Sequence, residues 1–147
     1  MRIQDIMTKD PSTVTPDASV REAAQVMKRE DVGIVPVIDG QSGRRLVGVV
    51  TDRDIAIRCI ADGKDGTCRV RDVMSTDDIA TCRESDDVDN VMDAMRTEKV
   101  RRIPIVDERG SLVGIVSQAD VLRKTSDTNR AGETVEQISE PGGRHTR

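Results

Sequence analysis

Apolar positions along the chain follow helical spacing in two stretches. Hydrophobic residues recur at i, i+3, i+4 and i+7 in both stretches, which places them on one face of a helix. Ser and Asp residues in front of each stretch can cap the helix N-terminus. The stripes are Val20, Ala23, Ala24 and Met27, and Val88, Val91, Met92 and Met95; the candidate caps are Asp17 or Ser19, and Ser85 or Asp87.

Short β-branched runs follow each predicted helix. Each run is joined by a turn rich in glycine and charge to a second apolar run, which predicts an antiparallel hairpin. A second helix is expected after the hairpin, and a short extended piece before the first helix. The predicted strands are 34–38 and 46–50, then 103–106 and 112–116; the extended pieces are 12–14 and 79–82; the second helices begin after Thr51 and Ser117.

The segments around these predicted elements are also similar in sequence between the two halves of the chain, so the chain contains one unit twice. Residues 2–7 (RIQDIM) return as 69–74 (RVRDVM), and residues 46–51 (LVGVVT) return as 112–117 (LVGIVS). Such a repeat determines the fold. We expect a mixed α/β (α+β) fold of two tandem β-α-β-β-α repeats that pack as a pseudo-twofold pair.

The repeat also predicts where the domains lie. We expect a first domain at 1–62, a linker at 63–68 and a second domain at 69–124. Residues 125–147 contain few large apolar side chains, so their burial cannot offset the entropy lost on ordering. We therefore expect a flexible C-terminal tail.

Composition narrows the possible functions. The chain has no Phe, Tyr or Trp, which excludes recognition by aromatic stacking. Its net charge of −4 disfavours nucleic acid and anionic membranes as partners. No apolar run approaches a membrane span and the N-terminus resembles no signal peptide, so we expect a cytoplasmic protein. The single histidine, His145, disfavours a Ser-His-Asp triad and a His-rich metal site, so neither catalysis nor a metal is expected.

Three cysteines without a CxxC motif are expected to be reduced thiols. Cys59 falls on the apolar face of the helix after Thr51 and is expected in the core. Cys68 falls in the predicted linker, where a redox role is left open.

A second repeated motif combines glycine, a hydroxyl and an acid. Residues 48–54 and 114–120 share the pattern Gly-x-x-Thr/Ser-x-x-Asp at a strand-to-helix junction. In one interpretation the hydroxyl and the acid form a helix capping box. In the other, the helix N-terminus and the hydroxyl meet a phosphate, and the Asp accepts both hydroxyls of a ribose. The glycine lets a ligand or a neighbouring strand approach the backbone.

These motifs, in this order and duplicated, resemble a tandem pair of CBS (cystathionine beta-synthase) domains, often called a Bateman module. The resemblance covers residues 1 to about 124 and rests on 5–7 (DIM) and 72–74 (DVM), 35–37 (VPV) and 103–105 (IPI), and the two Gly-x-x-Thr/Ser-x-x-Asp motifs. The chain is similar to stand-alone bacterial proteins of one CBS pair, among them hypoxic response proteins. The resemblance implies adenine-nucleotide binding in clefts between the two domains, and homodimers shaped as a flat disk of four CBS domains.

The resemblance also implies roles for individual residues. It assigns Asp54 and Asp120 to the ribose, and Thr51 and Ser117 to the phosphate side. It assigns the first extended segment of each copy to the adenine edge and a strand to the wall beside the base, with Cys82 lining the second cleft. These positions are Thr13, Val14, Thr81 and Cys82, and Ile34, Pro36, Arg102, Ile103 and Pro104.

The two repeats differ at the residues that precede Pro36 and Pro104. Copy two has Arg101 and Arg102 where copy one has Gly33 and Ile34. The resemblance implies that these arginines reach ligand phosphates, and the guanidinium fork suits phosphate geometry. The alternative is a solvated basic pair on a strand edge. Arg53 is a further candidate for a phosphate contact. The two clefts are therefore expected to differ.

The function expected from the sequence is regulatory. A CBS pair would bind AMP, ADP or ATP, or alternatively NAD or S-adenosylmethionine, and act on an unidentified partner by a ligand-induced shift in conformation. No catalytic cofactor is expected. The alternative is a ligand-free scaffold or dimerisation module in which both hydroxyl–acid pairs serve only as helix caps. Without aromatic residues, adenine would be held between aliphatic groups and read by backbone amides, which implies modest affinity.

Overall fold

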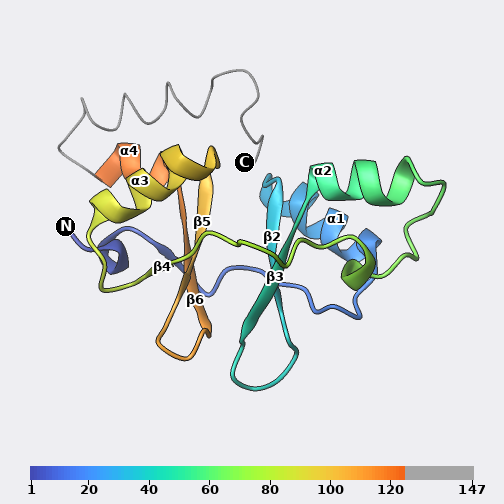
Figure 1. Ribbon diagram of the computed structural model, residues 1–147, viewed down its shortest axis with the longest axis horizontal. Coiled ribbons are helices and arrows are strands. Elements are labelled where there is room, and N and C mark those ends of the chain that lie inside the picture. Colours follow the sequence, from blue (N-terminus) through green and yellow to red (C-terminus); the bar gives the residue numbers. More distant parts are fainter. Residues whose placement is uncertain (125–147) are drawn as a thin grey trace. The chain divides into compact units, whose positions relative to one another are not determined.

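The computed structural model describes residues 1–124, which form two compact units (Figure 1). We call Ser12–Ile79 the central unit, and Met1–Pro11 together with 80–124 the terminal unit. Both units contain helices and strands, as the sequence predicts. The predicted tail at 125–147 lies outside the described residues. No helix within residues 1–124 is long and apolar enough to cross a bilayer.

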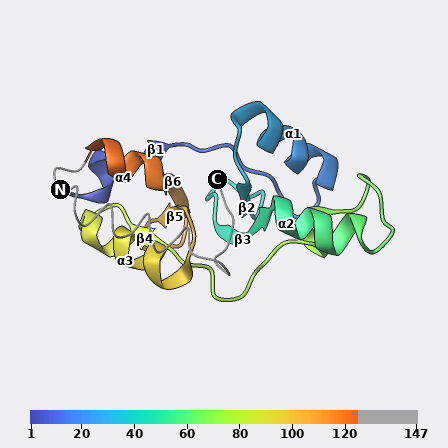
Figure 2. The ribbon, with the colours of Figure 1, turned by 90° about the horizontal axis from the view of Figure 1, so that it is seen from above.

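The central unit is built on the antiparallel hairpin of β2 (Ile34–Ile38) and β3 (Leu46–Thr51), in which Ile34 lies opposite Thr51. Two further segments bridge its strands, Val14 to Val37 and Ser75 to Val49. The helix α1 contacts β2 and α2 (Figure 2). The helical elements are α1 (Val20–Glu30), α2 (Asp52–Ile55), the π-helical turn Ala56–Ile60 that continues α2, and the 3-10 helix Val70–Asp72.

The terminal unit repeats this plan with a four-stranded sheet in the order β1-β6-β5-β4. The hairpin β5–β6 is antiparallel with Arg102 opposite Ser117, and β4 pairs with β5 in parallel. The helices α3 and α4 contact each other, and α3 contacts β5 while α4 contacts β6. The elements are the 3-10 helix Ile3–Asp5, β1 (Thr8–Lys9), β4 (Cys82–Arg83), α3 (Val88–Glu98), β5 (Arg102–Val106), β6 (Leu112–Ser117) and α4 (Gln118–Lys124).

The helix predictions are largely confirmed. Ser19 and Asp87 are the N-caps, and their side chains accept hydrogen bonds from the backbone N–H groups of Glu22 and Asp89, each at 3.1 Å. All four predicted stripe residues of α3 are buried. The prediction for Ala24 is wrong, because the buried stripe of α1 runs through Val20, Ala23 and Val26 and leaves Ala24 exposed on the other side.

Each compact unit takes an N-terminal segment from the other repeat in the sequence. Ile3, from the start of the first repeat, is fully buried in the core of the terminal unit. Val70, from the start of the second repeat, is fully buried in the core of the central unit. The compact units thus divide the chain differently from the boundaries 1–62 and 69–124, because these two short segments pack on the partner repeat's strands.

Two glycines make the close approach of these segments possible. A Cβ atom on Gly48 would lie 2.8 Å from the carbonyl oxygen of Ser75, and one on Gly114 would lie 2.9 Å from that of Thr8. Both distances are shorter than a carbon–oxygen contact allows. Of the two roles that the sequence left open for these glycines, the structure shows approach by a neighbouring chain segment.

Candidate functional site

The end of β3 and the start of α2 are joined by a complete capping box. The Thr51 hydroxyl accepts a hydrogen bond from the Asp54 N–H at 3.0 Å, and the Asp54 Oδ2 accepts one from the Thr51 N–H at 3.0 Å. Ser117 and Asp120 repeat both bonds at the start of α4, at 3.1 and 2.9 Å. The capping interpretation therefore holds in both units. Each cap uses Oδ2 of the carboxylate, so Oδ1 of Asp54 and of Asp120 takes no part in the cap.

The two carboxylates have different neighbours. Asp120 is only 6% exposed, and its Oδ1 accepts a hydrogen bond from the Arg123 guanidinium one turn along α4. Asp54 is half-buried, and the Ser75 hydroxyl lies at the long distance of 3.5 Å from both of its oxygens. The repeat places Ile57 where Arg123 stands in the other copy. Among residues 1–124, the central carboxylate thus has no ion pair like that between Asp120 and Arg123.

In the central unit the predicted residues lie along β2 and the segments beside it. Ile34 lies opposite Thr51 on β2–β3, and Asp54 follows on α2. The extended segment beside β2 is held by backbone hydrogen bonds from the Val14 N–H to the Pro36 carbonyl at 3.2 Å, and from the Ile38 N–H to the Val14 carbonyl at 2.9 Å. Thr13 immediately precedes it and is half-buried. The structure brings all six predicted residues of this unit to β2 and its neighbours.

The terminal unit arranges its predicted residues in the same way. Arg102 lies opposite Ser117, and the Gln118 N–H donates to the Arg101 carbonyl at 2.7 Å, so both arginines flank the start of α4. On the other side of β5, Cys82 lies opposite Ile105, next to the exposed Thr81. The terminal unit thus has Arg101 and Arg102 in the chain beside the start of α4 and the Arg123 guanidinium on Asp120, where the central unit has Gly33, Ile34 and Ile57.

Several of the predicted residues are buried, among them Ile34, Pro36 and Pro104 and three that belong to the hydrophobic clusters. Ile103 is fully buried, and Val14 and Cys82 are 7% and 8% exposed within the hydrophobic clusters. Burial, with a smaller effect of Asp86, raises the pKa of the Cys82 thiol to about 11. At these positions only the backbone can meet a ligand.

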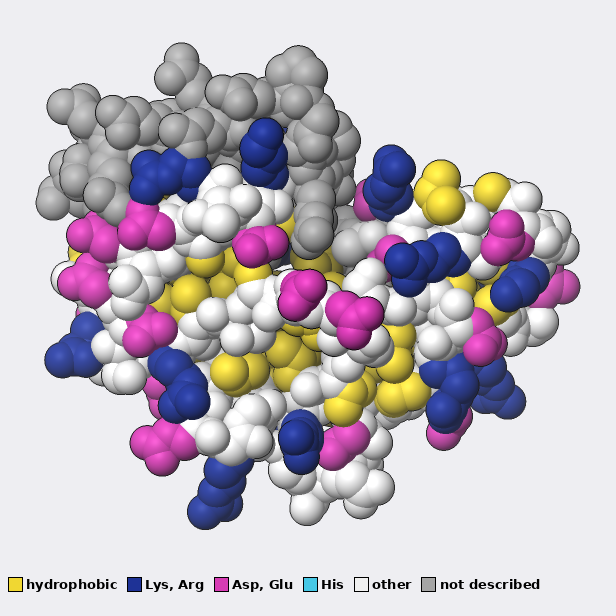
Figure 3. All heavy atoms as spheres, viewed as in Figure 1, with side chains coloured by type: hydrophobic (Ala, Val, Ile, Leu, Met, Phe, Trp, Pro, Cys, Tyr) yellow, Lys and Arg dark blue, Asp and Glu magenta, His cyan; other side chains and the backbone are white. Residues whose placement is uncertain are grey.

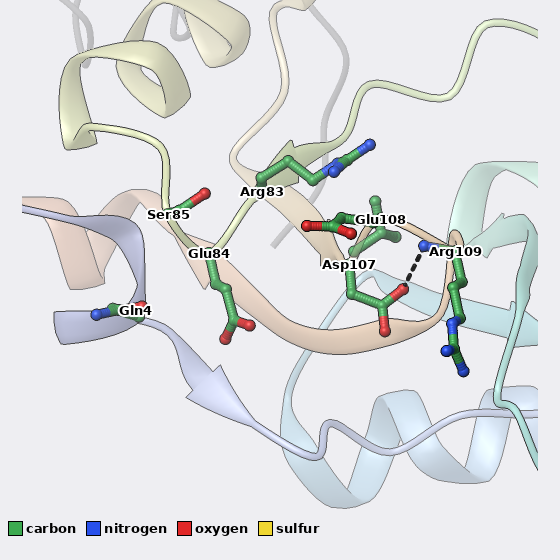
Figure 4. A pocket seen from close by; sticks show the side chains of 8 residues that line it. Gln4, Arg83, Glu84, Ser85, Asp107, Glu108 and Arg109 are labelled. Carbon is green, nitrogen blue, oxygen red and sulfur yellow. Dashed lines mark hydrogen bonds between the residues drawn. The ribbon is translucent and has the colours of Figure 1, made fainter.

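The structure also contains a hollow that the sequence did not indicate. It lies in the terminal unit, at the end of β5 opposite to Arg102 (Figure 4). The Asp107 carboxylate at its edge accepts a hydrogen bond from the Arg109 N–H at 2.9 Å. Its lining mixes both signs of charge, so it selects no simple ion. The lining residues are Gln4, Arg83, Glu84, Ser85, Val106, Asp107, Glu108 and Arg109.

Charge is mixed on the molecular surface as well. On the face shown in Figure 3, Lys and Arg side chains alternate with Asp and Glu, and no broad field of one sign covers it. Within the described part of the chain, no group of three or more His, Cys, Asp or Glu side chains is placed to hold a metal ion. The hairpin ends thus remain the candidate sites of the two units.

Comparison with known proteins places this geometry in a family. The family model of the CBS domain matches twice, at residues 3–59 and 70–127. The chain is 36% identical over 137 residues to the CBS domain-containing protein YhcV of Bacillus subtilis, covering 93% of this chain and 94% of that protein. It is 32% identical over 120 residues to Hypoxic response protein 1 of Mycobacterium tuberculosis, with 82% of each chain covered.

Solved structures agree with this placement. The CBS domain pair of protein MJ0100, crystallised with 5′-methylthioadenosine and S-adenosyl-L-methionine, matches 84% of this chain and 94% of its own at a TM-score of 0.72 and 29% identity. CBSX2 in complex with AMP matches 83% of this chain and 93% of its own at a TM-score of 0.70 and 29% identity. With a doubled family match and these similarities, the chain belongs to the CBS-domain family and contains two CBS domains in tandem.

Proposed function

We propose that this protein is a regulatory module that binds an adenine nucleotide and passes the signal to a partner by a shift in conformation. The observation that carries the proposal is the repeated carboxylate, Asp54 and Asp120, at the same hairpin end of two CBS domains. Two similar CBS-pair structures contain adenosine compounds, AMP in one and 5′-methylthioadenosine with S-adenosyl-L-methionine in the other. An adenosine-containing ligand is therefore the class we assign.

The ribose contact rests on the carboxylates. A carboxylate can accept hydrogen bonds from both hydroxyls of a ribose, and such bonds to a charged group are strong. Asp54 is the readier acceptor, since the Ser75 hydroxyl is 3.5 Å from both of its oxygens. Asp120 already accepts a hydrogen bond from Arg123, so a ribose there shares or displaces that guanidinium.

The phosphate contact is expected in the terminal unit. Arg101 and Arg102 flank the start of α4 there, whereas the central unit has Gly33 and Ile34 at the equivalent places. A guanidinium pairs with phosphate through two parallel N–H···O bonds. We therefore propose that the terminal site prefers the nucleotide with more phosphates, and that the central site takes AMP or a ligand without phosphate, such as S-adenosylmethionine.

Titration calorimetry with AMP, ADP, ATP, NAD and S-adenosylmethionine tests the proposal. We expect at least one of them to bind in the micromolar range. Asp54→Asn keeps an acceptor for the Thr51 N–H but removes the second carboxylate oxygen, so affinity at one site should fall about 10- to 100-fold, the equivalent of one hydrogen bond to a charged group. Ser19→Ala is the matched control, because it removes the N-cap of α1, outside both sites.

The control should lower stability by about 1 kcal/mol and leave the affinity unchanged. If no nucleotide binds at millimolar concentration, or if Asp54→Asn and Asp120→Asn both retain full affinity, the nucleotide proposal is wrong.

A ligand-free scaffold is the second candidate, and one observation favours it. Both hydroxyl–acid pairs already serve as helix caps, and this role explains their spacing without a ligand. Ile57 and Ile60, 51% and 61% exposed near the end of α2, offer an apolar surface for a second copy or another protein. We propose homodimerisation through this surface. Light scattering should show a dimer that Ile60→Glu weakens.

We also propose a cytoplasmic location and a purely regulatory role. Stand-alone CBS-domain proteins are generally regulatory, and we propose no catalytic activity and no catalytic cofactor. The three cysteines are all unpaired in the structure, which suits the reducing cytoplasm. A fluorescent fusion imaged against a membrane stain checks the location.

A further inference from the structure

Two of the three cysteines lie together in the central unit. Cys59 belongs to the π-helical turn Ala56–Ile60 and is fully buried in the core. Cys68 follows the next turn of the chain, is half-buried, and packs against the same core cluster. π-helical turns are rare, and they are frequent at functional sites. The arrangement places a buried thiol behind a partly exposed one.

Both cysteines converge on one backbone oxygen. The Cys59 thiol donates a hydrogen bond to the Asp65 carbonyl at 3.2 Å, and the Cys68 N–H donates to the same carbonyl at 3.1 Å. Burial, and to a smaller extent the Cys68 thiol, raises the pKa of the Cys59 thiol. The Cys68 thiol itself donates to the Arg69 carbonyl at 3.8 Å. The Cys59 thiol and the Cys68 N–H therefore meet at one oxygen atom, which places the two residues side by side in the folded protein.

The intervening turn holds the two cysteines in place. The Lys64 N–H donates to the Cys59 carbonyl at 3.0 Å, and the Asp65 carboxylate accepts from both the N–H and the hydroxyl of Thr67. The Cys68 carbonyl accepts from the Val20 N–H at 2.7 Å, which ties it to the first turn of α1. The backbone on each side of the pair is therefore held by hydrogen bonds.

We propose that Cys59 and Cys68 form a reversible intramolecular disulfide when the protein meets a peroxide. The Cys68 thiolate attacks one oxygen of hydrogen peroxide, which gives a sulfenic acid and releases hydroxide. The Cys59 thiol then attacks that sulfur, the S–S bond forms, and the sulfenic oxygen leaves as water. In total two thiols lose two protons and two electrons, and peroxide is reduced to two waters. A low-molecular-weight thiol reverses the step by exchange.

The order of attack follows from burial. Cys68 is reachable from solvent, whereas Cys59 is enclosed and its thiol is harder to ionise. Thiolate character and exposure decide which cysteine is oxidised first. Cys82 is the internal comparison, since it is buried in the other unit and the pKa of its thiol is raised to about 11. Cys59 lies on the turn that continues α2, the helix that begins beside Asp54, but the disulfide needs no bound nucleotide.

Peptide mapping tests the proposal directly, because trypsin separates the three cysteines. Cleavage after Arg58, Lys64 and Arg69 puts Cys59 in peptide 59–64 and Cys68 in peptide 65–69, while Cys82 falls in 72–83. After brief treatment of the native full-length protein with hydrogen peroxide, we expect 59–64 linked to 65–69 and separated again by dithiothreitol. Titration under denaturing conditions should then count one free thiol in place of three.

Two variants complete the test. Cys82→Ser should still form the linked peptides, with no free thiol left. Cys68→Ser should form none and keep two free thiols. Peptide 59–64 recovered unlinked while 65–69 is overoxidised overturns the proposal, and so does linkage of Cys68 to a second chain or to Cys82. The wild-type map alone suffices if a variant fails to fold.

Discussion

The third position of β3, Gly48, accepts only glycine because a neighbouring chain segment lies against it. A Cβ on Gly48 would lie 2.8 Å from the Ser75 carbonyl oxygen, which is part of a backbone bridge and cannot move aside. Gly48→Ala should therefore destabilise the protein by about 1–3 kcal/mol, the range for overpacking. Gly43→Ala is the control, because a Cβ there meets nothing within 4 Å. Urea unfolding of both variants gives the difference, and equal midpoints would contradict the close approach.

The turn between the two cysteines carries a pH dependence. Hydrogen bonds from the Thr67 hydroxyl and N–H hold the pKa of Asp65 below its ordinary value of 3.8. A lowered pKa means that this carboxylate stabilises the fold above the pKa of the unfolded state, and that the contribution is lost as the pH falls through the folded pKa. Thr67→Val removes the hydroxyl bond and should lower stability at neutral pH.

The stability difference between the wild type and Thr67→Val should be constant above about pH 5 and should shrink below pH 4, since protonation weakens the bond in the wild type. Thr67→Ser keeps the hydroxyl and should follow the wild-type curve. Urea unfolding from pH 3 to 7 provides the measurement. A difference that persists unchanged at pH 3 would assign the effect of Thr67→Val to packing.

Among the elements, α1 and α3 both end on a residue in the left-handed conformation that is not glycine. These are Asp31 (φ 53°) and Lys99 (φ 54°), each with its N–H bonded to a carbonyl of the last turn. Side chains with a Cβ adopt this conformation at a cost of about 1–2 kcal/mol. Lys99→Gly should therefore raise stability by up to about 1 kcal/mol, net of the chain entropy that glycine adds.

Ala24→Gly is the control of opposite sign. Ala24 is exposed within α1, where glycine costs about 1 kcal/mol. Thermal unfolding should move in opposite directions for the two variants. A lower melting temperature for Lys99→Gly would mean that the lysine side chain supports the end of α3.

The longer elements could be predicted because their patterns extend over many residues. The hairpin strands and the start of α1 and α3 agree with the sequence prediction to within one residue. The 3-10 helices Ile3–Asp5 and Val70–Asp72 could not, because three residues show no period. In the sites, the Thr/Ser–Asp spacing predicted the caps, but the pairing of Arg123 with Asp120 depends on a side-chain conformation that spacing does not encode.

At the scale of the whole molecule, a repeat reveals that two copies exist but not which copy each short segment joins. Residues 2–7 and 69–74 are similar in sequence, so either could pack on either hairpin. The structure pairs Thr8 with Ile115 of β6, and Ser75 with Val49 of β3. Each compact unit is therefore completed by the segment that begins the other repeat, and its stability depends on residues distant in sequence.

Because each N-terminal segment packs in the other compact unit, a substitution in it should destabilise that other unit. Ile3→Ala removes a fully buried side chain from the core of the terminal unit and should cost about 2–5 kcal/mol there. Amide hydrogen exchange should accelerate in β5 and β6, while β2 and β3, which follow Ile3 in the same repeat, keep their protection. Val70→Ala, in the core of the central unit, should give the reverse pattern. If Ile3→Ala instead loosens β2 and β3, residues 1–11 belong with the repeat they begin, and the exchanged arrangement is wrong.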